Sequence, residues 1–222
     1  MRFLENEARA AASLHILGDL FETWIGDDDP DPVRDAACVA LRNLASTGVS
    51  VYVMRGNRDF LYGADFEQRT GCTLLPDPVV VTLLGEKVLL THGDLLCTGD
   101  HAYQELRTTV RDPAFRDRVL RLPIEARQLL ASAARAGSKA HVSAASATIG
   151  AATIMDVAPE AVIAAFETSG TRTMIHGHTH RPATHQHDVA GEPATRHVLA
   201  DWGSTGEYLE VSGEGWRRRV VA

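Results

Sequence analysis

Residues 49–60 read VSVYVMRGNRDF, in which the polar tetrapeptide GNRD directly follows a short apolar run. An apolar run of this length that is rich in β-branched residues and ends at a glycine predicts a buried strand over residues 49–54. Polar residues just beyond the carboxyl end of a strand lie where α/β proteins bind their ligands. The stretch therefore predicts an α/β protein whose strand-end loops carry its chemistry.

The same arrangement occurs three more times along the chain. Asp19 ends LHILGD at 14–19, His92 lies in KVLLTHGD at 87–94, and TMIHGHTH at 173–180 contains His178 and His180. Each motif alone is weak, because polar turns and histidine pairs are common on protein surfaces. Together with Asn57 they supply carboxylate, amide and imidazole donors, a set that suits Mn²⁺ or a similar first-row divalent ion. A carboxylate can also bridge two ions, as in two-metal phosphoester chemistry.

The segments between these motifs predict helices, a hairpin and a closing sheet. Asp31 and Pro32 are typical of a helix start, and Gly85-Glu86 is typical of a hairpin turn. We expect helices near 2–12, 64–70, 100–137 and 159–168, and one that begins at Pro32 and is closed by Gly48. We expect strands at 14–17, 79–84, 87–91 and 173–175, a connection at 138–153, and antiparallel strands from His185 onward. Within residues 100–137, Asp112-Pro113 is expected to start one segment, Pro123 to interrupt the stretch and Gly137 to end it.

Composition limits the classes of function. The chain has 222 residues and a net charge of −7, which predicts one domain and argues against a nucleic-acid partner. Three cysteines without C-x-x-C spacing predict buried thiols rather than a disulfide framework or a thiolate zinc site. Neither a secretory leader nor an apolar run near 18 residues is visible, so we expect a cytoplasmic protein without an ordinary spanning helix.

The order of motifs resembles the calcineurin-like metallophosphoesterase superfamily, in which a GD, a GN followed by His or Arg, a His and a GH-x-H succeed one another. That resemblance implies a single α/β sandwich domain over residues 1–222, with a helical lid at about 100–155. GDLFETWIGDDDP at 18–30, THGDLLCTGD at 91–100 and IMDV at 154–157 are similar to one branch of the superfamily, which hydrolyses UDP-2,3-diacylglucosamine in bacterial lipid A synthesis. Arg58 points the same way, because general phosphodiesterases of the superfamily usually carry His there.

The resemblance implies a metal-dependent hydrolase that splits the pyrophosphate bond into UMP and 2,3-diacylglucosamine 1-phosphate. Two Mn²⁺ ions would activate the water that attacks the α-phosphorus. The implied metal ligands are Asp19, Asn57, His92, His178 and His180, and the implied catalytic residues are Asp19, Asn57, Arg58 and His178. Substrate contacts are implied for Asn57, Arg58, Asp100, Tyr103, Ser138 and His178. Ser138 is followed by a segment that lacks the family's Asn and Lys.

One family motif, an Asp-x-His before the GD, is absent. By the family pattern Asp19 bridges the two metals, so one site is complete and the other keeps only Asp19 and His180. We favour a start codon assigned too late, because the other motifs are intact. Loss of two-metal activity is the alternative explanation. Two other functions stay open: a metallophosphoesterase of nucleotides or phosphodiesters, and a non-catalytic binder of the lipid nucleotide.

Residues 106–139 carry eight Lys or Arg against three Asp or Glu, interspersed with leucines. A basic amphipathic stretch suits an anionic membrane surface, so we expect peripheral attachment to the cytoplasmic face of the inner membrane. A solvated helix packed on the domain is the alternative. No stable protein partner is expected.

Residues outside these motifs have plainer expectations. The acidic run 27–29 predicts a solvated loop, and His176 predicts a packed strand residue. His185, His187 and His197 predict polar surface positions, whereas Trp202 and Trp216 predict core or sheet positions.

Overall fold

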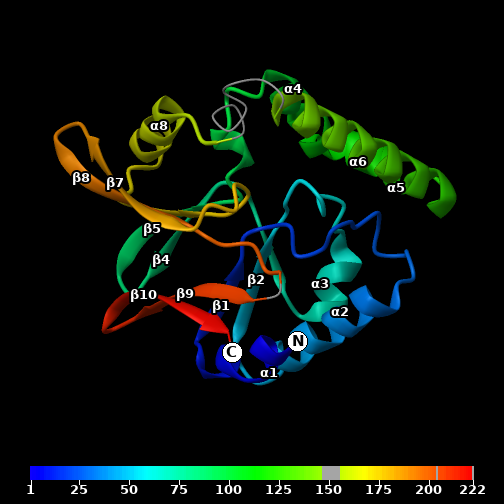
Figure 1. The fold of residues 1–222 in the computed structure, drawn as a ribbon. Helices are drawn as coiled ribbons and strands as arrows, with labels where there is room; N and C mark the ends of the chain where they lie inside the picture. The colour runs from blue at the N-terminus through cyan, green and yellow to red at the C-terminus, as the bar shows by residue number, and fades with distance from the viewer. Residues whose placement is uncertain (147–155, 204, 222) are drawn as a thin grey trace. The chain divides into compact units, whose positions relative to one another are not determined.

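The computed structural model describes residues 1–146, 156–203 and 205–221, with the backbone alone for 139–146. Helices and strands alternate along the chain, as expected for the α/β class (Figure 1). The chain divides into two compact units. The first contains Met1–Leu75 and Asp100–Ile154, and the second contains Pro76–Gly99 and Met155–Ala222. The single domain stays a prediction.

The first unit is built on a three-stranded parallel sheet in the order β1-β2-β3. Its strands are β1 (Ser13–Ile16), β2 (Ser50–Met54) and β3 (Thr73–Leu75). β1 and β2 correspond to the expected strands, whereas the three-residue β3 was not anticipated. Short helices α1 (Arg2–Glu5) and η1 (Glu7–Ala10) precede β1.

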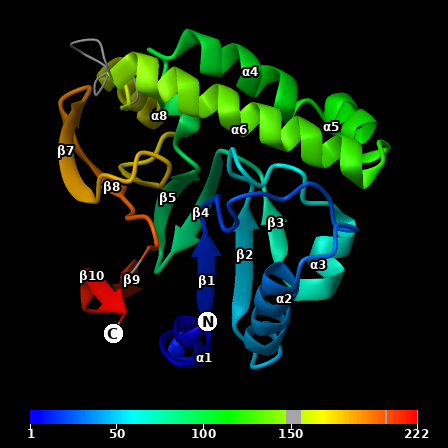
Figure 2. The same ribbon diagram turned by 45° about the vertical axis from the view of Figure 1, so that its right-hand side comes forward.

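Helix α2 (Pro32–Ala45) begins where the sequence predicts. The Asp31 side chain accepts hydrogen bonds from the backbone N–H groups of Val33 and Arg34, and Pro32 occupies the first turn. Cys38, Leu41 and Leu44 lie on its buried face, because they recur at helical spacing. The helix contacts β2, and α3 (Ala64–Thr70) packs against α2 (Figure 2).

Three further helices of the first unit form one group in both ribbon views: α4 (His101–Arg111), α5 (Pro113–Leu120) and α6 (Ile124–Ser146). Asp112 caps α5, as its Asp-Pro pair predicts. The expected stop at Gly137 is wrong, because α6 continues to Ser146. A glycine inside a helix costs only about 1 kcal/mol, and alanine-rich flanks offset that cost. Of the expected connection at 138–153, residues 147–153 lie outside the described residues.

The second unit contains a five-stranded mixed sheet in the order β4-β5-β6-β8-β7. The hairpin of β4 (Val79–Leu83) and β5 (Glu86–Thr91) forms as expected, and β6 (Thr173–His176) runs parallel to β5. Helix α8 (Pro159–Ser169) contributes Val162 and Phe166 to a core that also contains Leu89 and Met174. Burial of these apolar side chains stabilises the sheet that positions the histidine-bearing turns.

The strands after residue 182 form two hairpins. β7 (Ala183–Val189) and β8 (Glu192–Val198) are antiparallel to each other, but β8 is parallel to β6 and so extends the mixed sheet. β9 (Gly206–Ser212) and β10 (Gly215–Val221) form a separate two-stranded sheet. The expectation of one closing antiparallel sheet is therefore only partly right.

Candidate functional site

Asp19, Asn57 and Arg58 lie together in the first unit and are called the Asp19 group below. β1 and β2 are parallel neighbours, so the loops beyond their carboxyl ends meet at one edge of the sheet. Asp19 Oδ1 accepts a hydrogen bond of 3.0 Å from the backbone N–H of Arg58. A Cβ atom at Gly56 would lie 2.1 Å from the same oxygen, so only glycine fits at that position.

Asp59 supports the Asp19 group through hydrogen bonds, a role that the sequence motifs did not predict. Its fully buried carboxylate accepts hydrogen bonds from the backbone N–H groups of Gly56, Asp19 and Phe21 and from the Tyr62 hydroxyl. Burial raises the pKa of Asp59, and the charge of Asp19 adds to that shift, while the hydrogen bonds oppose it. The carboxylate therefore ties the loop after β1 to the loop after β2.

The Arg58 side chain is partly exposed and forms ion pairs within the first unit. Its guanidinium pairs with Glu22, and its Nε lies 3.6 Å from Asp19 Oδ2. The described ion pairs of Arg58 do not include Asp59, because the Asp59 carboxylate is buried. A guanidinium in this position presents a planar set of donors that matches phosphate oxygens.

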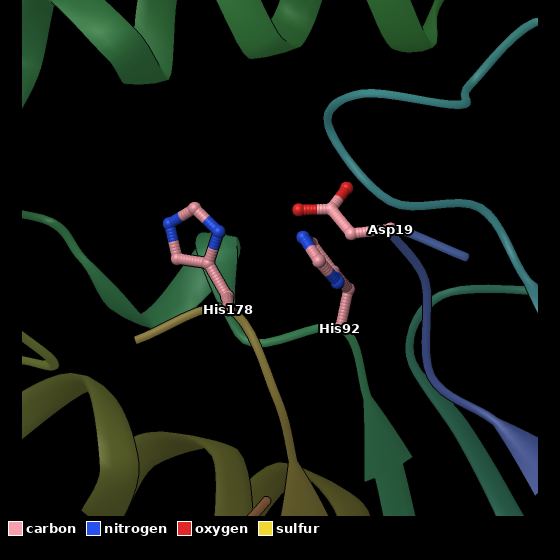
Figure 3. Close-up of side chains that lie close together, drawn as sticks. All are labelled: Asp19, His92 and His178. Carbon is pink, nitrogen blue, oxygen red and sulfur yellow. The ribbon is translucent and has the colours of Figure 1, made fainter. Parts of the chain in front are cut away.

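His92, His178 and His180 lie in the second unit and are called the His92 group below. His92 directly follows β5, and His178 and His180 follow β6, which is the parallel neighbour of β5. The rings of His92 and His178 meet edge to face with their centroids 5.0 Å apart. Figure 3 draws these two imidazoles and the Asp19 carboxylate as sticks. The backbone N–H of His92 is fixed by a 3.0 Å hydrogen bond to Asp77 Oδ1.

Unusual backbone conformations coincide with the candidate ligands. Among the described residues, the non-glycine positions with positive φ include Asp19 at 52°, His178 at 65° and His180 at 53°. The two others, Leu84 and Ala190, each precede a glycine in a hairpin turn. A left-handed backbone conformation costs free energy in any residue other than glycine, and such residues are concentrated at functional sites. The conformations thus mark the same positions as the motifs.

The buried ring of His176 lies next to the His92 group. Burial lowers the pKa of His176 to about 3, and the nearby charge of Arg196 contributes to the shift. His176 is therefore neutral at physiological pH, and it is a packed strand residue as expected.

Three expected substrate contacts, Asp100, Tyr103 and Ser138, lie at the start of α4 or on the helices. The Asp100 side chain caps α4 by accepting a 3.0 Å hydrogen bond from the backbone N–H of Tyr103. Ser138 is exposed on α6. The contacts of these three residues with a substrate stay predictions.

Two expectations about neighbouring residues are wrong. The acidic run is not a solvated loop: Asp27 accepts hydrogen bonds from Gly63 and Phe66, Asp28 pairs with Arg127, and Asp29 pairs with Arg34.

His197 is not a polar surface residue, because it is buried and stacks on Trp216 with ring centroids 5.0 Å apart. The expected buried thiols, in contrast, are confirmed at all three cysteines.

Comparisons with known proteins identify relatives along the whole chain. UDP-2,3-diacylglucosamine hydrolase of Stenotrophomonas maltophilia K279a is 50% identical and covers 100% of this chain and 90% of its own length. Proteins of the same name from Enterobacter sp. 638 and Pseudomonas paraeruginosa PA7 are each 47% identical, covering 97% and 98% of this chain and 88% and 89% of their own. A solved archaeal phosphodiesterase is 11% identical, with a TM-score of 0.39, and the match covers 82% of this chain and 76% of that chain.

A family model described as calcineurin-like phosphoesterase matches residues 2–182, which include every candidate metal ligand. The members of that family are metal-dependent hydrolases, and the imidazole, carboxylate and amide groups found here are chemically suited to divalent ions. The chain therefore belongs to the calcineurin-like phosphoesterase family.

Proposed function

We propose that this chain hydrolyses the pyrophosphate bond of UDP-2,3-diacylglucosamine, giving UMP and 2,3-diacylglucosamine 1-phosphate. The observation that carries the proposal is the 47–50% identity, over nearly the whole chain, to proteins named for hydrolysis of that substrate. The backbone strain at Asp19, His178 and His180 supports placing the reaction at the Asp19 and His92 groups.

Asp19, Asn57, His92, His178 and His180 are the proposed metal ligands, and Mn²⁺ is the proposed ion. Bound divalent ions would lower the pKa of a water molecule and offset the charge that develops on the phosphoryl oxygens. The chain itself holds the ligands ready: Gly56 and Asp59 shape the turn of Asp19, and Asp77 fixes the backbone of His92.

Arg58 is the proposed residue that binds the phosphoryl oxygens. Its guanidinium can donate two parallel hydrogen bonds to a phosphate, whereas Lys would offer only a point charge. Glu22 and Asp19 hold the guanidinium before substrate binds. Asp100, Tyr103 and Ser138 are the proposed contacts to the rest of the head group.

Substitution of His92 tests the metal and reaction assignments. We expect purified His92→Ala to lose nearly all hydrolysis of UDP-2,3-diacylglucosamine assayed with detergent and Mn²⁺. His185→Ala, which removes an exposed imidazole of β7, is the matched control and should keep full activity. Unchanged turnover in His92→Ala would overturn the site assignment. Hydrolysis of soluble nucleotides instead would favour a different phosphoesterase, and substrate binding without turnover by the unsubstituted chain would favour a binder.

A second assay asks whether the ligands in this chain suffice for activity without an Asp-x-His motif. The chain should be compared with a version preceded by a strand that carries Asp-x-His. Equal activity would mean that the ligands present here suffice. Activity only in the extended version would mean that the reaction needs the two additional ligands.

We also propose that the α4–α6 group attaches the protein to the cytoplasmic face of the inner membrane. Leu106, Leu129 and Leu130 are all at least half exposed on these helices, among basic side chains. None of the described helices is both long and apolar enough to cross a bilayer. Each basic residue near an anionic surface contributes about 1 kcal/mol to attachment.

Sedimentation with vesicles tests this attachment. Arg118→Gln/Arg121→Gln should reduce binding to phosphatidylglycerol-containing vesicles roughly 10-fold or more, because two exposed charges of α5 and its C-terminal end are lost. Arg217→Gln/Arg219→Gln in β10 changes the net charge equally and is the control. Equal losses in both variants would exclude the helices as the attachment surface.

A further inference from the structure

Arg196 and His176 form a buried pair directly behind the His92 group. Arg196 projects from β8, and His176 is the last residue of β6, the parallel neighbour of β8. The ring of His176 is 0% exposed and Arg196 is 6% exposed. A guanidinium Nη of Arg196 lies 2.9 Å from His176 Nε2. Burying a guanidinium is costly, so its hydrogen bonds matter to the structure.

The chemistry of the pair defines where the imidazole proton lies. Arginine has donors only, so the contact requires His176 Nε2 to accept a hydrogen bond. The ring proton is then on Nδ1, which lies 2.9 Å from the carbonyl oxygen of Gly177 and donates to it. Arg196 therefore orients a donor onto the backbone of the turn that carries His178 and His180.

The same turn is connected to His92. The N–H of Gly177 donates to the carbonyl oxygen of His92 over 2.9 Å, and the N–H of Thr179 donates to the carbonyl oxygen of Gly177 over 2.8 Å. A Cβ atom at Gly93 would lie 2.8 Å from His176 Nδ1. The His176 ring thus packs against the turns on which all three candidate histidine ligands lie.

The turn needs such support because its conformation is unfavourable by itself. His178 and His180 both have positive φ, which costs free energy for a residue with a Cβ atom. The carbonyl oxygen of Gly177 accepts hydrogen bonds from both His176 and Thr179. These bonds fix the peptide group that directly precedes His178.

We propose that Arg196 is a positioning residue that acts through the Nδ1–H tautomer of His176 to hold the His92 group in its metal-binding geometry. The proposal rests on the proposed metal site, and neither Arg196 nor His176 is one of the proposed ligands. Residues that orient metal ligands typically contribute 10- to 100-fold to metal affinity.

Direct Mn²⁺ binding, measured by calorimetry without substrate, is the main test. Arg196→Met should bind Mn²⁺ 10- to 100-fold more weakly, with kcat reduced and KM unchanged at saturating metal. Arg196→Lys, which keeps a buried donor, should recover part of the affinity. Arg218→Met removes another arginine that hydrogen-bonds to backbone carbonyls of the second unit, so it controls for general destabilisation. Wild-type affinity in Arg196→Met, or an equal loss in Arg218→Met, would overturn the proposal.

Two substitutions of His176 separate its hydrogen bond to Arg196 from its hydrogen bond to Gly177; together these two bonds are called the relay below. His176→Asn can keep the donor to Gly177, and His176→Gln can keep the acceptor for Arg196. We expect His176→Asn to retain more Mn²⁺ affinity than His176→Gln, because the bond to Gly177 is the one that touches the ligand turn. The reverse order would contradict the relay.

The tautomer can be measured in the unsubstituted chain, whatever the variants do. Nitrogen-15 NMR of the imidazoles should show His176 protonated on Nδ1 alone, and the Nε2–H form would overturn the proposal. Absence of Mn²⁺ binding by the unsubstituted chain would instead contradict the proposed metal site, which keeps the two failures distinguishable.

Discussion

Asp59 determines the shape of the Asp19 turn without being a candidate ligand. Its carboxylate accepts from three backbone N–H groups and one hydroxyl. Only an acid offers acceptors in every direction, whereas Asn places an NH₂ group where one oxygen now accepts. The residue lies in GNRD, so its position was visible in the sequence, but its inward direction was not.

We therefore expect Asp59→Asn to lower the free energy of unfolding by about 1–3 kcal/mol, the cost of leaving a buried donor unsatisfied. Urea denaturation followed by circular dichroism measures the change. Asp65→Asn, on the exposed side of α3, is the control and should alter stability by less than about 0.5 kcal/mol. Equal midpoints for Asp59→Asn and the unsubstituted chain would mean that these hydrogen bonds contribute nothing net.

Arg127 is a buried side chain that joins helix α6 to the loop after β1. The guanidinium of Arg127 donates to the carbonyl oxygens of Ile25 and Leu122 and to both carboxylate oxygens of Asp28. The arginine lies so close to Gly26 that a Cβ atom there would be 2.0 Å from its Nη1. Helical periodicity places Arg127 on α6 but cannot indicate its partner, which is distant in sequence.

This ion pair predicts a pH dependence. The hydrogen bond from Arg127 lowers the pKa of Asp28, so the stabilisation is fully present above the unfolded-state pKa of about 4. It is lost as the pH falls through the lower pKa of the folded state. Asp28→Asn should therefore reduce stability at pH 7 by about 1 kcal/mol or less, because Asp28 is largely exposed.

Urea denaturation at several pH values between 7 and 3 measures this difference, which should shrink toward zero at the acidic end. Asp117→Asn, on the exposed surface of α5, should show little difference across the range. A stability difference for Asp28→Asn that grows on acidification would contradict the assigned sign.

At the scale of the whole chain, local patterns predicted the elements better than their partners. The Asp-Pro cap of α2 and the strand-end motifs depend on neighbours in sequence, and they appear as expected. The β4–β5 hairpin also forms, but its turn is Leu84-Gly85, one residue earlier than the expected Gly85-Glu86. Trp202 was expected in the core or in a sheet, but it lies outside the strands and is half exposed, with its indole N–H bound to the carbonyl oxygen of Glu207. Side-chain environment depends on long-range packing, which a hydrophobic pattern does not specify.

Metal binding should stabilise the second unit, because His92, His178 and His180 all lie in it. At a free Mn²⁺ concentration 100 times the Kd, binding adds about 2.7 kcal/mol to the free energy of unfolding. Amide hydrogen exchange in β5 and β6 should therefore slow when Mn²⁺ is added. The slowing should disappear in His92→Ala and persist in His185→Ala, whose imidazole lies on β7. Equal slowing in His92→Ala and in the unsubstituted chain would mean that His92 is not a ligand of the metal.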